Sequence, residues 1–325
     1  MEEVVLRVDD LTMHYATRQG WVRAVEGVSF SLGRGEALGL VGESGCGKTS
    51  VAVCLLRALP DNGRILKGSI LLDGTDLVSL TEEEMRQHRW RRISMVFQAA
   101  MSSLNPVQRV GAQVVEVIHV HESVGLDAAR ERVVQLFSLV GLDRQLMERY
   151  PHELSGGMKQ RAVIAMALAC RPDVIIADEP TTALDVIVQH RVLQELKQVQ
   201  QSQGTAIIYI SHDIGVVAEV CTRIAVMYAG RIAEVAPTAE LLTHPVHPYT
   251  QALLSSFPRL RGPKHSLASL PGDPPSLVAP PSGCRFHPRC PYATSLCQEK
   301  DPALQEHRPR HLAACWHPLL GGDEQ

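Results

Sequence analysis

A glycine-rich octapeptide at positions 42–49, GESGCGKT, constrains the fold of this chain more than any other feature. It fits the pattern G-x-x-x-x-G-K-[ST], follows an apolar run at 36–41 and opens a helical pattern at 48–59. In such a loop the backbone N–H groups curl around phosphates, and the helix that follows adds partial positive charge. The motif therefore predicts a strand, a phosphate-binding loop and a helix. A glycine-rich turn with an exposed lysine is the alternative, which this context disfavours.

The loop also predicts roles for single residues. We expect Lys48 to reach the β- and γ-phosphates of a bound nucleotide and the Thr49 hydroxyl to ligate Mg²⁺. The candidate nucleotide-binding residues of this stretch are Gly42, Glu43, Ser44, Gly45, Cys46, Gly47, Lys48, Thr49 and Ser50.

A second apolar run, DVIIA at positions 173–177, ends in two carboxylates, Asp178 and Glu179. Acids at strand ends are often only solvated caps, but downstream of a phosphate-binding loop they indicate a hydrolytic site. Asp178 is expected to hold Mg²⁺, and Glu179 to polarise the attacking water. Neighbouring residues of a strand point to opposite faces, which favours this division of labour.

Apolar runs that alternate with helical patterns predict an α/β fold with a parallel sheet. Buried strands are expected at 36–41, 173–177 and 205–210, with helices at 48–59, 186–201 and 214–221. We expect half-exposed strands at 4–14 and 70–72, a hairpin over 223–235 that turns at Ala229-Gly230, and a helical insertion over 101–158.

Proline marks the expected domain boundary. Residues 1–240 hold six of the 20 prolines, whereas 12 lie between Pro258 and Pro318. Because proline lacks an amide donor and fixes φ, such a segment favours loops over long helices and central strands. We therefore predict a domain at 1–240, with a helical subdomain inserted at about 99–160, and a loop-rich C-terminal extension at 241–325.

Composition limits the function classes. The formal charge of −3 argues against nucleic-acid binding through bulk positive charge. No apolar run approaches the length of a membrane span, and the acidic start MEEVVLRVDD is unlike a secretory signal peptide. We expect a soluble, intracellular protein with no nucleic-acid partner.

The segment LSGGMKQR at 154–161 identifies a family. Its first residues Leu154, Ser155, Gly156, Gly157 and Met158 resemble the signature motif of ATP-binding-cassette (ABC) ATPases. The rest of the cassette pattern follows in order across residues 1–240: Tyr15, the octapeptide, Gln98, the carboxylates, Thr182 to Asp185 (TALD) and His212.

The resemblance implies a P-loop ATPase with a RecA-like core, an antiparallel β subdomain and an inserted helical subdomain. In such proteins the signature loop contacts ATP held by a partner subunit, and Asp185 belongs to the D-loop. Gln98 would contact Mg²⁺ and γ-phosphate, His212 would hold the γ-phosphate, and Tyr15 would stack on adenine. Catalytic roles fall to Glu179, His212 and Gln98; a core role for Tyr15 is the alternative.

Three further stretches resemble ATPases of dipeptide and oligopeptide importers: 98–113, 150–158 and 247–254. This resemblance implies a peripheral protein on the cytoplasmic face of the bacterial inner membrane. Its partners would be a second ABC ATPase subunit, in a heterodimer first and a homodimer second, two transmembrane permeases and an extracytoplasmic substrate-binding protein. Nickel, glutathione or opine import, or a soluble non-transport ABC ATPase, are the alternatives. Cys46 departs from the serine common in this family.

Four of the eight cysteines, Cys284, Cys290, Cys297 and Cys315, lie close together in the proline-rich segment. Four thiolates on one inorganic centre would replace the core that this segment lacks. Zinc sites usually have closer cysteine pairs, but nearby histidines leave zinc open, and free thiols remain the plain alternative. The resemblance favours a [4Fe–4S] cluster, because some peptide-importer ATPases with similar spacing carry one.

Overall fold

The computed structural model describes residues 3–97, 103–181, 184–256 and 272–320. The chain divides into two compact units. The first unit comprises residues 1–7, 31–37 and 71–210, and the second comprises 8–30, 38–70 and 211–325. The boundary predicted near residue 240 stays a prediction.

The first unit contains a parallel sheet whose strands are buried on both faces. Its strands are β6 (Ile93–Val96), β7 (Val174–Asp178) and β8 (Ala206–Ser211), with β7 in the middle. Val174 pairs with Ile93 on one side and with Ala206 on the other. Such burial explains why the sequence shows continuous apolar runs here rather than alternation. The predicted parallel arrangement is confirmed.

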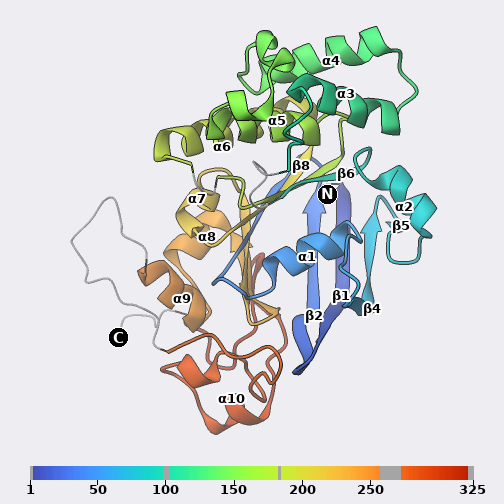
Figure 1. Ribbon diagram of the computed structural model, residues 1–325. Coiled ribbons are helices and arrows are strands. Elements are labelled where there is room, and N and C mark those ends of the chain that lie inside the picture. Colours follow the sequence, from blue (N-terminus) through green and yellow to red (C-terminus); the bar gives the residue numbers. More distant parts are fainter. Residues whose placement is uncertain (1–2, 98–102, 182–183, 257–271, 321–325) are drawn as a thin grey trace. The chain divides into compact units, whose positions relative to one another are not determined.

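Helices make up most of the remainder of this unit (Figure 1). The segment after β6 forms α3 (Val110–His121), α4 (Leu126–Leu139), the short 3-10 turns η2 (Arg144–Glu148) and η3 (Pro151–Glu153), and α5 (Gly156–Ala167). The unit also holds β5 (Thr75–Asp76), α2 (Glu82–His88) and the long α6 (Val186–Gln203). In α3 the apolar residues Val110, Val114 and Ile118 recur one turn apart and are buried, the helical spacing that the sequence shows.

The second unit holds two groups of strands. In the first group β1 (Val4–Thr17) lies between β2 (Gly20–Gly33) and β4 (Gly63–Leu72), and in Figure 1 helix α1 (Lys48–Leu55) lies beside these strands. The second group runs β3 (Ala37–Val41), β9 (Arg223–Tyr228), β10 (Arg231–Pro237), β12 (His311–Ala313) and β11 (Gln305–Arg308). Strand β3 is parallel to β9, and the strands beyond are antiparallel.

The predicted hairpin is confirmed as β9 and β10. Its turn residues Ala229 and Gly230 both have positive φ, 45° and 84°, as a tight two-residue hairpin turn requires. The remaining helices of the second unit are α7 (Ile214–Ala218), α8 (Thr238–Thr243), α9 (Pro248–Ser255), the turn η4 (His287–Arg289) and α10 (Ser295–Glu299).

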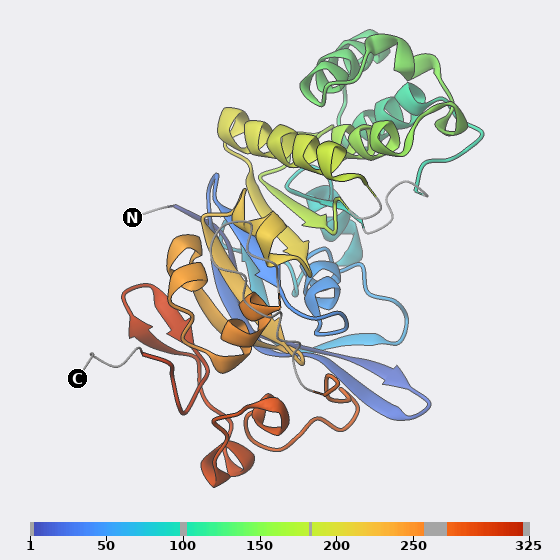
Figure 2. The same ribbon diagram turned by 90° about the vertical axis from the view of Figure 1, so that its left-hand side faces the viewer.

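The proline-rich segment contributes two strands that the sequence does not predict. Strand β12 extends the sheet by pairing with β10, and β11 pairs with β12 (Figure 2). A buried polar cluster ties β12 to β10: His311 Nε2 lies 2.5 Å from Glu234 Oε1, and both side chains are almost fully buried. The Glu234 carboxylate also accepts the backbone N–H groups of Val246 and His247. These bonds compensate its burial.

Candidate nucleotide site

The octapeptide forms the predicted strand–loop–helix in the second unit. All five residues of β3 are buried, the loop follows at Gly42, and α1 begins at Lys48. The Lys48 side chain turns back along the loop, where its ammonium donates to the carbonyl oxygens of Gly42 at 2.7 Å and Glu43 at 3.1 Å. Lys48 is only 7% exposed, whereas Ser44, Gly45 and Thr49 are exposed. The loop thus holds a buried cation beneath an accessible backbone, a suitable arrangement for binding phosphates.

Two glycines of this loop are needed for steric reasons. Gly42 has a φ of 153°, and a Cβ there would lie 2.2 Å from the carbonyl oxygen of Met227. Gly47, the N-cap of α1, has a φ of 107°, and its Cβ would lie 2.2 Å from the carbonyl oxygen of Ala24. Strands β2 and β9 therefore approach the loop too closely for any side chain at these positions.

Replacing Gly47 by alanine is expected to weaken nucleotide binding at least about tenfold, because the loop must move away from Ala24 to make room for the methyl group. Equilibrium binding of the fluorescent analogue mant-ATP to the purified chain measures this. Gly45→Ala is the matched control: it also has positive φ, 78°, but no atom lies within 4 Å of a Cβ there. Equal losses in both variants would contradict the steric explanation.

Cys46 is the residue of the loop that departs from the family pattern. Its side chain is buried, and Sγ lies 3.7 Å from Lys48 Nζ. Burial raises the pKa of the Cys46 thiol, which keeps it neutral at physiological pH. The backbone N–H of Gly230 donates to the Cys46 carbonyl oxygen at 2.8 Å, so the β9–β10 turn also fixes the loop at this point.

Two more predicted site residues lie in the second unit. The Tyr15 hydroxyl, on β1, donates to Ser50 Oγ of α1 at 3.2 Å, so the structure brings these two predicted residues together. Burial raises the pKa of this phenol. His212 is exposed and follows Ser211, the last residue of β8. After it, Asp213 caps α7 by accepting the N–H of Gly215 at 2.8 Å.

The two carboxylates of the second motif lie in the first unit. Asp178 is the last residue of β7 and is fully buried. Glu179 follows the strand with a φ of 49°, and its N–H donates to the carbonyl oxygen of Ile210 at 2.9 Å. The argument from strand alternation is therefore wrong for Glu179, because the strand has ended. Glu179 instead has a left-handed backbone, a costly conformation that is common at functional sites.

The signature residues form the N-terminus of α5, also in the first unit. Ser155 is the N-cap, and its Oγ accepts the N–H of Met158 at 3.3 Å. Ser155 and Gly156 are exposed, whereas Leu154 is buried. A Cβ at Gly157 would lie 2.7 Å from Val188 Cγ1, so this glycine allows α5 and α6 to pack closely.

Asp185 and the side chains after it are accessible. Asp185 caps α6 by accepting the N–H of Val188 at 2.9 Å. The next two residues, Val186 and Ile187, are 80% and 77% exposed although both are apolar. Gln98 and Thr182 lie outside the described residues.

Two residues that contact the phosphate-binding loop are absent from the sequence-based prediction. Tyr249 of α9 accepts the backbone N–H of Glu43 at 3.0 Å. Arg289 of η4 forms two hydrogen bonds with the Glu43 carboxylate, at 2.7 and 3.1 Å. Because both residues lie some 200 positions or more after Glu43, no local pattern could have pointed to these contacts.

The structure does not confirm a metal centre at the four C-terminal cysteines. Among the described residues, which include all four, no three His, Cys, Asp or Glu side chains are arranged to hold a metal ion. The thiols nevertheless influence one another. Burial raises the pKa of Cys284 and Cys290 and raises that of Cys315 to about 12, and neighbouring cysteines of this group add to each increase. The Cys284 N–H also donates to the Cys297 carbonyl oxygen at 2.8 Å.

Comparison with known proteins places these motifs in one family. A family model described as ABC transporter matches residues 25–182, and one described as oligopeptide/dipeptide transporter, C-terminal region, matches 233–297. The oligopeptide transport ATP-binding protein of Salmonella typhimurium is 45% identical over 318 residues, covering 97% of this chain and 94% of that protein. The dipeptide transport ATP-binding protein of Bacillus subtilis is 43% identical over 331 residues, covering 99% of each.

The fold agrees with these sequence matches. A bacterial ABC transporter cassette solved as a dimer resembles this chain with a TM-score of 0.65 and 25% identity, covering 72% of this chain and 98% of that cassette. No helix of the described ranges combines the length and apolar composition that crossing a membrane requires. The chain therefore belongs to the ABC transporter family, among the ATP-binding proteins of oligopeptide and dipeptide transport.

Proposed function

We propose that this chain is the ATP-hydrolysing subunit that powers import of dipeptides or oligopeptides through a membrane ABC transporter. The observation that carries this proposal is the phosphate-binding loop around Lys48, in a chain that matches peptide-transport ATP-binding proteins over almost its full length. Hydrolysis of ATP to ADP and phosphate would supply the free energy for transport.

The proposed roles follow the chemistry of each residue. The loop from Gly42 to Ser50 binds the phosphates, Tyr15 contacts adenine and His212 the γ-phosphate. The Thr49 hydroxyl and the Asp178 carboxylate supply hard oxygen atoms, the ligands that Mg²⁺ prefers, and Gln98 completes the proposed set. Bound Mg²⁺ would neutralise charge on the β- and γ-phosphates. Glu179 accepts a proton from the attacking water.

We further propose that two ATPase subunits pair, and that the signature loop of one acts on the nucleotide of the other. Support comes from the exposed N-terminus of α5 at Ser155 and Gly156, which directs N–H groups and partial positive charge outward. The exposed apolar residues Val186 and Ile187 beside Asp185 gain from burial in such an interface. A structural neighbour of this chain was itself solved as a dimer. We propose that the partner is a related but distinct ATPase, which makes the pair a heterodimer.

The proposed assembly contains two transmembrane permeases and an extracytoplasmic substrate-binding protein, with this chain on the cytoplasmic face of the inner membrane. Reconstitution of these subunits in proteoliposomes tests the proposal. A radiolabelled tripeptide supplied with the binding protein should accumulate only when ATP is present on the ATPase side, and ADP should give no uptake. ATP-dependent uptake of nickel or glutathione without peptide uptake would contradict the proposed cargo.

We also propose that residues 241–325 form a C-terminal extension in which the four cysteines hold a [4Fe–4S] cluster. Neighbouring cysteines of the group contribute to the raised pKa of Cys284, Cys290 and Cys315, and sulfur is the ligand that iron–sulfur clusters require. No three of them have metal-binding geometry here, so cluster binding requires them to converge and to lose the protons that burial favours.

Anaerobic purification of the full chain tests the cluster. The expected product is brown, absorbs broadly near 400 nm and contains about four irons per chain. Cys315→Ser should lose colour and iron, whereas Cys54→Ser, a buried cysteine on α1, should keep both. A colourless preparation with stoichiometric zinc would refute the cluster in favour of zinc, and one with neither metal would indicate free thiols.

A further inference from the structure

Arg289 connects the C-terminal segment to the phosphate-binding loop. Its guanidinium donates from Nη1 to Glu43 Oε2 at 2.7 Å and from Nη2 to Glu43 Oε1 at 3.1 Å. The Arg289 side chain is 6% exposed and that of Glu43 is 22% exposed. Nη1 also donates to the Tyr228 hydroxyl at 3.3 Å. A two-bond pair with this little solvent fixes the position and the orientation of both groups.

Arg289 contacts an aromatic cluster through Tyr228. Tyr228, Tyr249 and Phe286 form an aromatic cluster with ring centroids 4.6 to 5.4 Å apart. Tyr249 from this cluster also accepts the backbone N–H of Glu43, so both the main chain and the side chain of Glu43 are fixed. Residues from beyond the cassette motifs therefore contact the phosphate-binding loop at Glu43.

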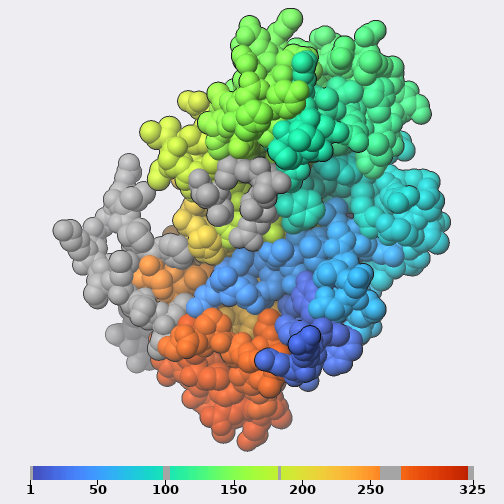
Figure 3. Space-filling view, viewed as in Figure 1, coloured from blue at the N-terminus to red at the C-terminus, as the bar shows by residue number. Residues whose placement is uncertain are grey.

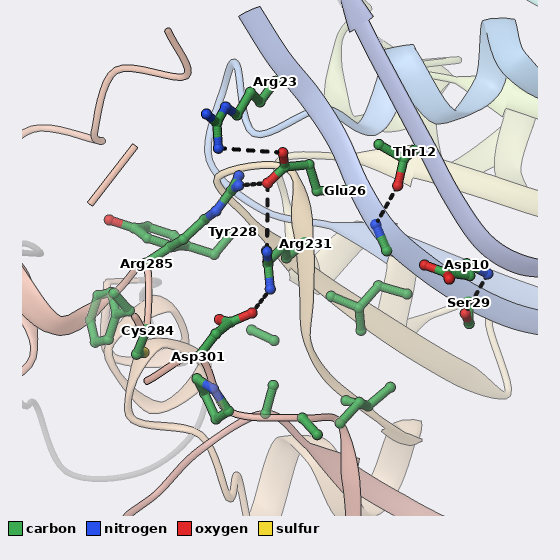
Figure 4. Close-up of a pocket in the computed structure, with 18 of the residues that line it drawn as sticks. Asp10, Thr12, Arg23, Glu26, Ser29, Tyr228, Arg231, Cys284, Arg285 and Asp301 are labelled. Carbon is green, nitrogen blue, oxygen red and sulfur yellow. Dashed lines mark hydrogen bonds and ion pairs between the residues drawn. The ribbon is translucent and has the colours of Figure 1, made fainter. Parts of the chain in front are cut away.

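A second arginine of the C-terminal segment, Arg285, contacts strand β2 and the β9–β10 turn. Arg285 forms an ion pair with Glu26, on which Arg23 and Arg231 also converge at 3.8 and 3.6 Å (Figure 4). Arg285 donates to the carbonyl oxygen of Ala229, in the β9–β10 turn that also binds Cys46. It lines a pocket of about 740 Å³. In the space-filling view the orange and red C-terminal residues lie directly against blue N-terminal residues (Figure 3).

We propose that Arg289 is a positioning residue for ATP binding: it holds the Glu43 carboxylate in place and neutralises it beside the phosphate-binding loop. This inference rests on the proposed function, since it concerns the same nucleotide. Through this pair the cysteine-bearing segment between Cys284 and Cys290 controls the affinity for ATP.

Electrostatics predicts that loss of Arg289 lowers the affinity for ATP. Glu43 is part of the loop that binds a polyanion, and a carboxylate there repels phosphate unless a cation offsets it. Loss of Arg289 leaves that negative charge uncompensated and only partly solvated. ATP affinity should then fall, while turnover at saturating ATP should change little, because Arg289 acts on the loop and contacts no reacting atom.

Titration of purified full-length chain with mant-ATP tests the proposal. Arg289→Met should raise Kd about tenfold, and Arg289→Lys, which keeps the charge but loses the paired bonds, should have a smaller effect. Glu43→Gln introduced with Arg289→Met should restore much of the affinity, because the repelling charge is gone. Arg308→Met is the matched control: Arg308 lies in the same C-terminal segment but donates to the Leu320 carbonyl oxygen instead.

Lys48→Ala separates the two hypotheses. If wild type binds mant-ATP, Lys48→Ala does not, and Arg289→Met and Arg289→Lys both stay within twofold of wild type, the positioning role is wrong and the proposed function stands. Absence of rescue by Glu43→Gln would equally overturn the charge mechanism. If wild-type chain binds no nucleotide, the proposed function fails and this inference with it. In the assembled transporter the Arg289→Met change should appear in KM for ATP and leave kcat within about twofold.

Discussion

Glu179→Gln is expected to slow ATP hydrolysis by about 10²–10⁴-fold while ATP still binds. An amide cannot accept the proton of the attacking water, but it has nearly the same size as the carboxylate. The left-handed backbone at this position, with its N–H bound to Ile210, does not depend on the side-chain charge. The phosphate-binding loop is unchanged, so affinity should remain. The steady-state ATPase rate of the assembled transporter, with mant-ATP binding measured in parallel, checks both parts.

Glu83→Gln is the control for this substitution. Glu83 is an exposed residue of α2 whose partner Arg86 is exposed as well, so its loss should change neither rate nor affinity. Near-normal hydrolysis by the Glu179→Gln transporter would mean that Glu179 is not the base or that the partner's site carries the turnover. Inactivating the corresponding glutamate of the partner subunit as well distinguishes these two results.

Local sequence predicts those parts of the fold that depend on residue pattern and on contacts between near neighbours in the chain. The strand–loop–helix at Lys48, the hairpin at Ala229-Gly230 and helix α6 all follow from residue pattern and turn chemistry. Strand β12 could not be predicted, because it pairs with the distant strand β10, and β11 depends on it because β11 pairs with β12. Strand β2 pairs with its neighbour in the sequence, β1, and is missing from the sequence-based prediction. In the case of β12, the buried His311–Glu234 pair secures a three-residue strand in a segment whose prolines indicate loops.

The residues of the candidate site also fall into two groups: those that local motifs identify and those that only the tertiary fold brings to the site. Contiguous motifs give the residues of the phosphate-binding loop, the carboxylates and the signature segment directly. The left-handed backbone of Glu179 is not visible in the sequence, since glutamate has no preference for it. Tyr249 and Arg289 reach Glu43 only through the tertiary fold. Residue spacing identifies the four C-terminal cysteines as a group, but it does not determine the geometry that a metal would need.

Ser155→Arg is expected to reduce hydrolysis of the nucleotide held by the partner subunit about 10²-fold or more, with little effect on nucleotide affinity at this chain's own Lys48 site. Ser155 is exposed at the N-terminus of α5, where a small side chain leaves the helix N–H groups accessible. A long arginine covers these groups and removes the Oγ that accepts the Met158 N–H. The lost cap costs about 1 kcal/mol of helix stability, which alone does not unfold the subunit.

Thr81→Arg is the control for the lost helix cap. Thr81 is the exposed N-cap of α2 and accepts the Glu84 N–H, so the substitution removes a cap and adds the same charge away from the signature loop. Photo-crosslinking of azido-ATP to each subunit of the assembled transporter reports nucleotide binding at the two sites separately, and the ATPase rate measured in a Glu179→Gln background reports turnover of the partner's nucleotide. Thr81→Arg should leave both measurements near wild type. Loss of crosslinking confined to this chain, with the partner's turnover intact, would contradict a signature loop that acts on the partner's nucleotide, because the arginine would then have disturbed only its own subunit.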